Sequence, residues 1–216
     1  MERMKQEKDW DKKLNIDTIG RDDSKEDACH YPYEPTPYCV LERLADSGYI
    51  SDENLVIDYG CGKGRVGFFL NHQLGCKVIG LDFDERMCQV AYENLQNYEA
   101  KSAKGAAKKT NIEVIKDKMP IEFLCEDAEK YEIKGADAFY FFNPFSVEIL
   151  QSVVAKIKKS YYENLREIQL FFYYPSDEYI SYLMTVTEIM FIDEIDCRDL
   201  FEGNNDRERI VIFEMM

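Results

Sequence analysis

The chain has 216 residues with 27 basic and 42 acidic side chains, which gives a formal net charge of -15. With 45% hydrophobic and 13% aromatic residues, it can bury the core of one domain, and this excludes global disorder. Nucleic-acid binding depends on Lys and Arg that neutralise phosphates, so we do not expect a nucleic-acid partner. Only two histidines are present, and we expect no bound metal.

Cysteine usage and hydropathy predict a cytoplasmic protein. The seven cysteines include no C-x-x-C pair, and their odd number fits no closed disulfide framework. Free cysteines are typical of a reducing compartment. The first ten residues, MERMKQEKDW, lack the apolar core of a signal peptide. No stretch reaches the roughly 18 apolar residues that span a bilayer, so we expect no membrane partner.

The N-terminal region is charged and then rich in proline. Residues 1–30 mix both charge signs without a sustained period, which predicts a mobile or loosely docked arm. Three prolines within residues 32–37 then impose an extended path. Thr36 is placed to cap a helix over 37–47, with Pro37 at its first position.

From residue 55 onward, apolar strands alternate with helical patterns. We expect strands over 55–59, 77–82, 112–116, 121–125, 136–145, 167–175, 187–196 and 207–216, of which 112–116 is the weakest. We expect helices from the glycine-rich turn to about 74 and over 85–95, 147–157 and 178–184, and an exposed Lys-rich insertion at about 100–118.

This order predicts an α/β fold. Continuously apolar strands separated by helices indicate a parallel sheet covered on both faces. The last two strands follow each other without a helix and should pair antiparallel. We therefore expect residues 31–216 to form a single three-layer sandwich, with a seven-stranded, mostly parallel sheet and a C-terminal antiparallel hairpin.

The first of these strands ends in a glycine-rich turn that indicates a ligand site. Gly60, Gly62 and Gly64 stand at alternate positions, where they allow a tight turn and close approach to a ligand. The helix that follows offers unpaired N–H groups to an anionic group. Asp82 ends the next strand, twenty residues after Gly62, where a carboxylate can accept hydrogen bonds from both ribose hydroxyls. Asp58 precedes the turn.

Two classes of ligand compete for this turn. Gly62, Gly64 and Gly67 also satisfy G-x-G-x-x-G, the dinucleotide fingerprint, so an NAD(P)-dependent oxidoreductase is one alternative. The carboxylate of Asp58 would repel a pyrophosphate, whereas it can hold an ammonium directly or through water. This favours a ligand with a ribose and an amino acid end.

Three motifs in order resemble those of class I, Rossmann-like S-adenosylmethionine-dependent methyltransferases: VIDYGCGKG, GLDFD and LCEDAEKY. The resemblance extends from about residue 33 to residue 216. It implies S-adenosylmethionine as cofactor, bound by Asp58, Gly60, Cys61, Gly62, Gly64 and Asp82, with Phe83 beside the adenine and Asp127 and the Ala128 backbone at the adenine edge. The segments IDTIG, YEPTP, DYGCGKGR and FFNPF together resemble a bacterial group of such proteins.

The predicted strand over 136–145 ends in Asn143, Pro144 and Phe145, at the position that faces the transferred methyl group in this family. The motif is similar to the N-P-P-[YF] signature of enzymes that methylate adenine N6 or the glutamine side-chain amide, but it lacks the second proline. Asn143 offers a carbonyl acceptor and an amide donor, and Phe145 can cover a planar acceptor. The resemblance also implies that Asn143 contacts the cofactor.

The segment Tyr33–Pro37 resembles the T-P segment that closes over the methionine end of the cofactor in those enzymes, which implies a cofactor contact for Thr36. His30 beside it could reach the site if the arm folds over. Proline-aromatic junctions of this kind also serve simply to stop strands or to fix an arm to a domain.

These features predict methyl transfer to a small-molecule or protein acceptor, with nitrogen favoured over oxygen. A neutral amine needs no strong base, and histidine is scarce, although Asp, Glu and Tyr remain candidate bases. A non-catalytic S-adenosylmethionine-binding or interaction protein is the third alternative.

Overall fold

The strands of this chain form one sheet in the computed structural model, which describes residues 2–24, 31–107, 120–203 and 205–216. The elements are α1 (Glu2–Leu14), α2 (Tyr38–Asp46), β1 (Leu55–Tyr59), α3 (Arg65–Leu74), β2 (Lys77–Asp82), α4 (Glu85–Ala107), β3 (Ile121–Cys125), β4 (Ala138–Phe141), α5 (Val147–Glu163), β5 (Gln169–Tyr173), α6 (Asp177–Leu183), β6 (Ile189–Asp196), the short 3-10 helix η2 (Arg198–Leu200) and β7 (Arg209–Met215). The expected strand over 112–116 lies outside the described residues.

The sheet has seven strands in the order β3-β2-β1-β4-β5-β7-β6. Neighbours from β3 to β5 pair parallel, and β7 pairs antiparallel with both β5 and β6. The predicted fold class is therefore confirmed. Because the chain moves outward one way from β1 and then the other way from β4, the carboxyl ends of these two strands border a crevice.

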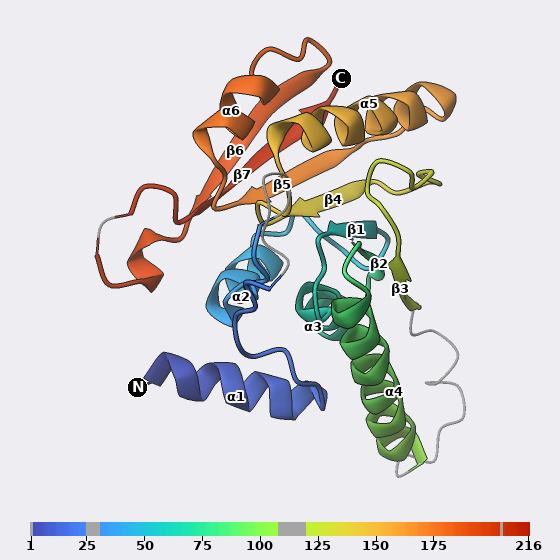
Figure 1. The fold of residues 1–216 in the computed structure, drawn as a ribbon, viewed down its shortest axis with the longest axis vertical. Coiled ribbons are helices and arrows are strands. Elements are labelled where there is room, and N and C mark those ends of the chain that lie inside the picture. Colours follow the sequence, from blue (N-terminus) through green and yellow to red (C-terminus); the bar gives the residue numbers. More distant parts are fainter. Residues whose placement is uncertain (1, 25–30, 108–119, 204) are drawn as a thin grey trace.

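Helices cover both faces of the sheet, as Figure 1 shows. Alternate residues of each strand point to opposite faces, so Val56 of β1 packs in the cluster formed with α2, α3 and α4, while Ile57 packs in the cluster formed with α5 and α6. Both residues are fully buried. These two apolar layers fix the sheet whose carboxyl ends carry the site.

The start of α2 corrects one prediction. The helix begins at Tyr38, its N-cap position is occupied by Pro37, and no side chain caps it. The hydroxyl of Thr36 instead lies 3.0 Å from the hydroxyl of Tyr140 in β4. Thr36 therefore connects the proline-rich segment to the sheet and does not cap the helix.

The N-terminal region is also more ordered than we expected. Residues 2–14 form α1, which lies along α2 and α3 (Figure 1). The Trp10 ring stacks on Tyr38 at 5.6 Å between centroids and meets Phe69 edge-on at 4.9 Å. Its indole N–H donates to Glu42 Oε1 at 2.8 Å. The expectation of a loosely docked arm is wrong for these residues, because their single tryptophan and their acidic side chains are used in packing.

A buried ionic network joins α1 to the first turn of α3. The guanidinium of Arg65 is 3% exposed and forms an ion pair with Glu7, and its Nη2 lies 3.8 Å from Asp11 Oδ1. Asp11 also accepts hydrogen bonds from the backbone N–H of Thr18 at 2.6 Å and from the Tyr38 hydroxyl at 2.6 Å. A buried cation needs such partners, so Arg65 and α1 depend on each other.

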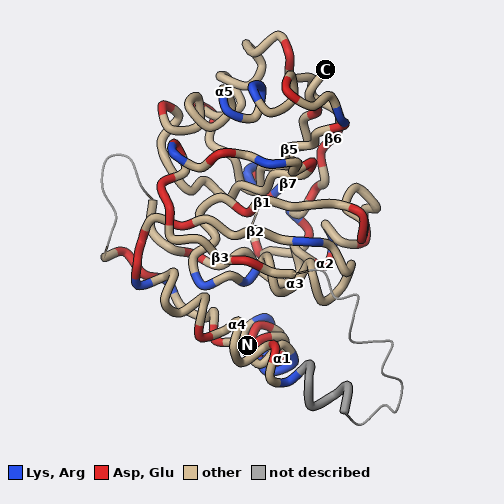
Figure 2. Tube along the Cα trace, turned by 90° about the vertical axis from the view of Figure 1, so that its right-hand side faces the viewer, with Lys and Arg blue, Asp and Glu red and all other residues tan. Residues whose placement is uncertain are grey.

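Helix α4 extends further than the pattern over 85–95 predicted. It continues to Ala107, so the first part of the expected Lys-rich insertion is helical. The rest, residues 108–119, lies outside the described residues. In the view of Figure 2, Lys and Arg are scattered among Asp and Glu. Within the described part of the chain, no helix is long and apolar enough to cross a membrane.

Replacing Asp11 tests whether α1 is an integral part of the domain. Asp11→Ala should lower the free energy of unfolding by about 3 kcal/mol, because it leaves Arg65 with one buried charge partner and removes the acceptor of Thr18 and Tyr38. Asp9→Ala, on the exposed side of the same helix, should change it by less than about 0.5 kcal/mol. Urea unfolding measures both values. Equal stability of the two variants would mean that α1 is loosely docked after all.

Candidate functional site

The turn between β1 and α3 is built from glycines that other segments touch closely. Gly60, Gly62 and Gly64 have φ angles of 73°, 52° and 88°, a region that favours glycine. A Cβ on Gly60 would lie 2.4 Å from Pro144, and one on Gly62 would lie 2.2 Å from the ring of Tyr33. Gly60 and Gly62 therefore allow the end of β4 and the proline-rich segment to pack against the turn. From the sequence, we expected them to allow close approach of a ligand.

One cavity at the carboxyl ends of β1, β2 and β4 brings most of the predicted site residues together. These are Thr36, Asp58, Gly60, Cys61, Asp82, Phe83, Asp127, Ala128, Asn143, Pro144 and Phe145. Gly62 and Gly64 belong to the turn but do not line the cavity. Tyr33 and Glu34 of the segment expected to close over the cofactor also line it, and sequence reasoning assigned no role to the further lining residues Asp22, Tyr31, Asp84, Glu126 and Phe142.

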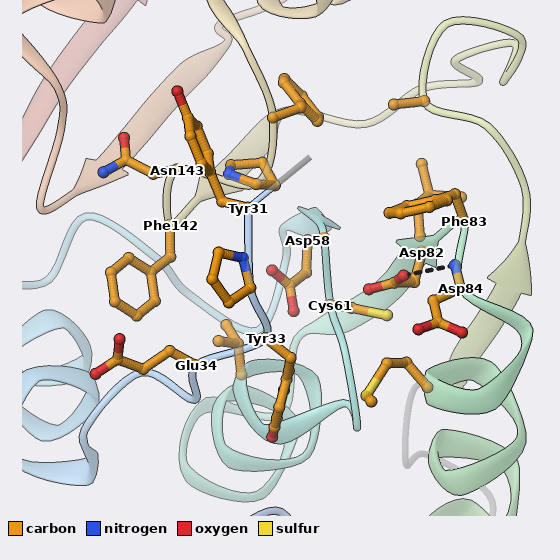
Figure 3. Close-up of a pocket in the computed structure, with 18 of the residues that line it drawn as sticks. Tyr31, Tyr33, Glu34, Asp58, Cys61, Asp82, Phe83, Asp84, Phe142 and Asn143 are labelled. Carbon is orange, nitrogen blue, oxygen red and sulfur yellow. Dashed lines mark hydrogen bonds between the residues drawn. The ribbon is translucent and has the colours of Figure 1, made fainter. Parts of the chain in front are cut away.

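Asp82 is held by two backbone amides. The N–H of Gly62 donates to its Oδ2 at 2.8 Å, and the N–H of Asp84 donates to its Oδ1 at 2.9 Å (Figure 3). Burial raises the pKa of Asp82, while these two hydrogen bonds act in the opposite direction. Each carboxylate oxygen can accept a second hydrogen bond, so the oriented group suits a vicinal pair of hydroxyls such as those of a ribose.

Asp58 is the group in the cavity with the least protein support. Its side chain is 2% exposed, and Oδ2 has no hydrogen-bond partner among the described residues. Burial, together with the negative charge of Asp82, raises the pKa of Asp58 to about 8. A buried carboxylate without a partner is costly, and a cationic ligand group would supply one. Figure 3 shows Asp58 between Phe142 and Phe83.

The predicted adenine side is more open. Phe83, directly after β2, is 41% exposed and lies at one end of the cavity (Figure 3). Asp127 accepts from the backbone N–H of Glu129 at 2.9 Å and pairs with Lys130 at 3.0 Å. Its carboxylate is therefore partly occupied by its own loop, and Ala128 lines the cavity beside it. Their contact with an adenine stays a prediction.

The side chain of Asn143 is used within the protein. Its amide group donates to the backbone carbonyl of Tyr174 at 2.5 Å, and its Oδ1 accepts from the backbone N–H of Ser176 at 3.2 Å. Asn143 has a positive φ of 39°. The structure thus gives Asn143 a role in fixing the loop after β5, and its acceptor-positioning role stays a prediction.

Phe145 is packed against aromatic neighbours at the edge of the cavity. Its side chain is 4% exposed, and its ring packs edge-on against Tyr59 and Phe141, at 6.3 Å and 6.4 Å. Phe145 still lines the cavity, and its role as a cover for an acceptor stays a prediction. Tyr31, at 43% exposure, and Phe142 also line the cavity, on the same side of Asp58 as Asn143 (Figure 3). The tyrosine-proline segment was visible in the sequence, but nothing in it showed that its first tyrosine would reach the end of β4.

The proline-rich segment crosses the cavity as a strap, which we define as residues 31–36. Tyr33 forms an antiparallel bridge with Asp22, and its hydroxyl donates to the carbonyl of Thr18 at 2.6 Å. The N–H of Tyr31 donates to the carbonyl of Pro144 at 3.4 Å. The strap therefore connects the N-terminal region, the glycine turn and the end of β4. His30 lies outside the described residues.

The cavity is strongly acidic. Seven carboxylates line it, from Asp22, Glu34, Asp58, Asp82, Asp84, Glu126 and Asp127. Arg65 is the one basic residue among the described lining residues, and its guanidinium is paired with α1. Such a lining suits a cationic ligand better than a dinucleotide phosphate. Within the described chain, no group of three or more His, Cys, Asp or Glu is arranged to hold a metal ion.

Comparisons with known proteins agree with this geometry. Residues 50–132 match the family model of a methyltransferase domain. A protein-lysine N-methyltransferase of Saccharolobus islandicus is 29% identical over 68 residues, which are 31% of this chain and 42% of the relative. A histone-lysine N-methyltransferase, H3 lysine-79 specific, of Dictyostelium discoideum is 33% identical over 69 residues, 32% of this chain and 4% of the relative. The chain thus spans less than half of either relative.

Solved structures share the fold. A TehB-like SAM-dependent methyltransferase from Corynebacterium glutamicum has a TM-score of 0.53 at 15% identity, covering 82% of this chain and 88% of that one. Magnesium protoporphyrin IX methyltransferase from Synechocystis, solved with bound SAM, has a TM-score of 0.52 at 18% identity, covering 83% and 77%. An rRNA methylase from Streptococcus thermophilus has a TM-score of 0.50 at 16% identity, covering 85% and 98%. The fold therefore does not support our expectation that nucleic acid is excluded as a partner.

The domain match and the shared fold point to the same cofactor. The matched family uses S-adenosylmethionine. The acidic cavity fits that cationic, ribose-bearing molecule, because Asp82 is oriented and Asp58 Oδ2 has no partner among the residues described. Residues 50–132 thus match a methyltransferase domain, and the fold is similar to those of S-adenosylmethionine-dependent methyltransferases.

Proposed function

We propose that this protein transfers a methyl group from S-adenosylmethionine to a nitrogen atom of a small-molecule or protein acceptor. The observation that carries the proposal is the buried carboxylate of Asp58 at the end of β1, whose Oδ2 has no partner in the part of the chain that the structure describes and which lines an acidic cavity. The ammonium of the cofactor's methionine end would neutralise it, directly or through water. The family match over residues 50–132 supports the same cofactor.

The roles of the cavity residues follow from their positions along it. We assign the ribose hydroxyls to Asp82, whose carboxylate the two amides hold in one orientation. Phe83, Asp127 and Ala128 would border the adenine. Thr36 stays a proposed contact of the methionine end, since it is buried beside Tyr140 in the same lining.

The chemistry asks the protein mainly for alignment. When bound, S-adenosylmethionine supplies an electrophilic methyl group on a sulfonium, and the protein orients donor and acceptor in line. The strap and Pro144 would exclude water from this line, because they lie over the glycine turn. An amine that arrives neutral can attack without a base.

The described cavity favours nitrogen over oxygen as the acceptor atom. Burial raises the pKa of Tyr140 and of Tyr33 well above the ordinary range of tyrosine, so neither phenol provides a base near neutral pH. No histidine is among the described lining residues. Both curated relatives carry names of lysine N-methyltransferases, which supports nitrogen and makes a protein lysine a candidate acceptor. The net charge of -15 remains our argument against DNA or RNA.

A cofactor panel tests the proposal. S-Adenosylmethionine and S-adenosylhomocysteine should raise the melting temperature, whereas NAD and NADP should not. Asp82→Asn should weaken S-adenosylmethionine binding by about 10- to 100-fold, because a hydrogen bond to a charged group contributes roughly 1.5–3 kcal/mol. Asp52→Asn, at an exposed carboxylate that does not line the cavity, is the matched control. A shift with NAD alone would support the oxidoreductase alternative. Tight cofactor binding without transfer to any amine would support the non-catalytic one.

The raised pKa of Asp58 links stability to pH. The pKa of about 8 in the folded protein lies above the value of about 3.9 in an unfolded chain. The folded state therefore holds the proton more tightly, and the stability that this contributes is complete below pH about 4 and is lost as the pH rises toward 8. The cofactor's ammonium requires the ionised carboxylate of Asp58. Ionisation of Asp58 therefore lowers the stability of the unliganded protein but allows cofactor binding.

Asp58→Asn separates these two effects. Without ligand, the variant should be more stable than wild type by about 5 kcal/mol at pH 8, and the difference should shrink toward zero near pH 4. S-Adenosylmethionine binding should weaken by at least about 10-fold, because the neutral amide does not pair with an ammonium. Urea unfolding between pH 4 and 8 and calorimetric titration measure the two quantities. A stability difference independent of pH would show that Asp58 does not ionise in this range.

A further inference from the structure

A second cavity adjoins the cofactor cavity on the side away from Asp82. Five residues line both of them, namely Tyr31, Pro32, Glu34, Asn143 and Phe142. Figure 3 shows Tyr31, Glu34, Phe142 and Asn143 on the opposite side of Asp58 from Phe83. If the adenine lies at Phe83, this second cavity, which we call the groove, begins where the methionine end of the cofactor lies.

The far wall of the groove is a loop held in an uncommon backbone conformation. Asn143 after β4 and Tyr174 after β5 both have positive φ, at 39° and 52°. The amide of Asn143 bonds the carbonyl of Tyr174 and the N–H of Ser176, so it fixes this conformation from the neighbouring strand. Left-handed non-glycine residues cost free energy and gather at functional sites. Two of them at adjacent strand ends indicate a wall with a required shape.

Arg207 is fixed to the same wall. Its Nε donates to the carbonyl of Pro175 at 3.1 Å, its Nη2 donates to the carbonyl of Tyr174 at 3.0 Å, and its guanidinium lies 4.2 Å from the centre of the Tyr174 ring. Nη1 has no acceptor among the described residues. Because the side chain is oriented in advance, Arg207 can bind an anionic group at little cost in conformational entropy.

The two cavities differ in charge. Three arginines and two glutamates line the groove, against seven carboxylates and one arginine in the cofactor cavity. Both groove carboxylates have partners: Glu34 pairs with Arg21 at 3.4 Å, and Glu208 accepts from the Tyr173 hydroxyl at 2.7 Å. A basic groove in a chain of net charge -15 is suited to an anionic ligand.

We infer that the groove is the acceptor subsite and that it takes a small planar amine carrying a carboxylate, which Arg207 binds. This inference rests on the proposed function. The rings of Tyr31, Phe142 and Tyr174 line the groove and would flank the planar part. In the transfer, the amine lone pair forms the new N–C bond, the C–S bond breaks with its electrons staying on sulfur, and the nitrogen proton goes to solvent. A lysine side chain of a basic protein carries no such carboxylate and meets three arginines.

Binding of aminobenzoates tests the subsite without depending on turnover. The 2-, 3- and 4-aminobenzoates place amine and carboxylate at three spacings, and aniline lacks the carboxylate. With wild-type protein saturated with S-adenosylhomocysteine, at least one aminobenzoate should bind in a calorimetric titration, and aniline should bind at least about 10-fold more weakly. Arg207→Gln should reduce that binding by at least about 10-fold, a loss typical of one charged hydrogen-bond partner. Arg198→Gln, in η2 and paired with Asp196, should leave it unchanged.

Several outcomes would overturn the inference. These are absence of aminobenzoate binding to wild type, equal binding to Arg207→Gln, or tighter binding and methylation of a lysine peptide in place of the aminobenzoates. If Arg207→Gln fails to fold, Arg207→Lys replaces it, which keeps the charge but loses the planar fork. Its affinity for the aminobenzoate should lie between the affinities of wild type for the aminobenzoate and for aniline. The affinity for S-adenosylhomocysteine, measured in parallel, separates the two proposals. If only the subsite inference is wrong, wild type still binds S-adenosylhomocysteine. If the proposed function is wrong, wild type does not bind S-adenosylhomocysteine either.

Discussion

The buried guanidinium of Arg65 is the constraint on which the site depends. It stands at the first position of α3, where the positive end of the helix dipole adds to the cost of burying a cation. Glu7 of α1 forms an ion pair with it, while Thr18 and the carbonyl of Thr36 accept its remaining hydrogen bonds, at 2.7 Å and 3.1 Å. One side chain thus holds α1, the segment before the strap and the end of the strap against the glycine turn. The cavity is bordered by segments that are distant in sequence. It keeps its shape because the buried charge of Arg65 needs partners from each of these segments.

Charge also divides the molecule into functional parts. The acidity of the chain is partly concentrated at the ends of β1 and β2, where Asp58 and Asp82 are buried close enough for the charge of one to raise the pKa of the other. Such a pair is unfavourable in the protein alone and favourable with a cationic ligand. Across the strap the balance reverses around Arg207. A reaction that joins a sulfonium donor to an anionic acceptor would use this contrast to keep each ligand in its own cavity.

Much of the fold and half of the site could be predicted from the sequence, because those features depend on neighbours along the chain. Apolar runs and their spacing predicted the strands and the closing hairpin, and the glycine turn with Asp82 twenty residues later predicted the cofactor side. Thr36 was wrongly assigned as a helix cap, and the packing of Phe145 was not foreseen, because their partners, Tyr140 and Tyr59, come from other elements. The burial of Arg65 could not be predicted, because an arginine after a glycine turn is ordinarily exposed. Its two acidic partners lie in a helix more than fifty residues earlier, and the local sequence does not indicate them.

The sequence by itself determined the strands and helices from residue 37 onward, the glycine turn after β1 and the acidic side chains at its edge, since local pattern and strand polarity suffice for these. Only the tertiary structure decided that the N-terminal residues form a docked helix, that the side chain of Asn143 bonds the loop after β5, and that Arg207 lines a second cavity beside the first. In each of these features, side chains from segments distant in sequence pair their charges and hydrogen bonds away from water. Which side chains meet in this way depends on the folded geometry and not on the local sequence.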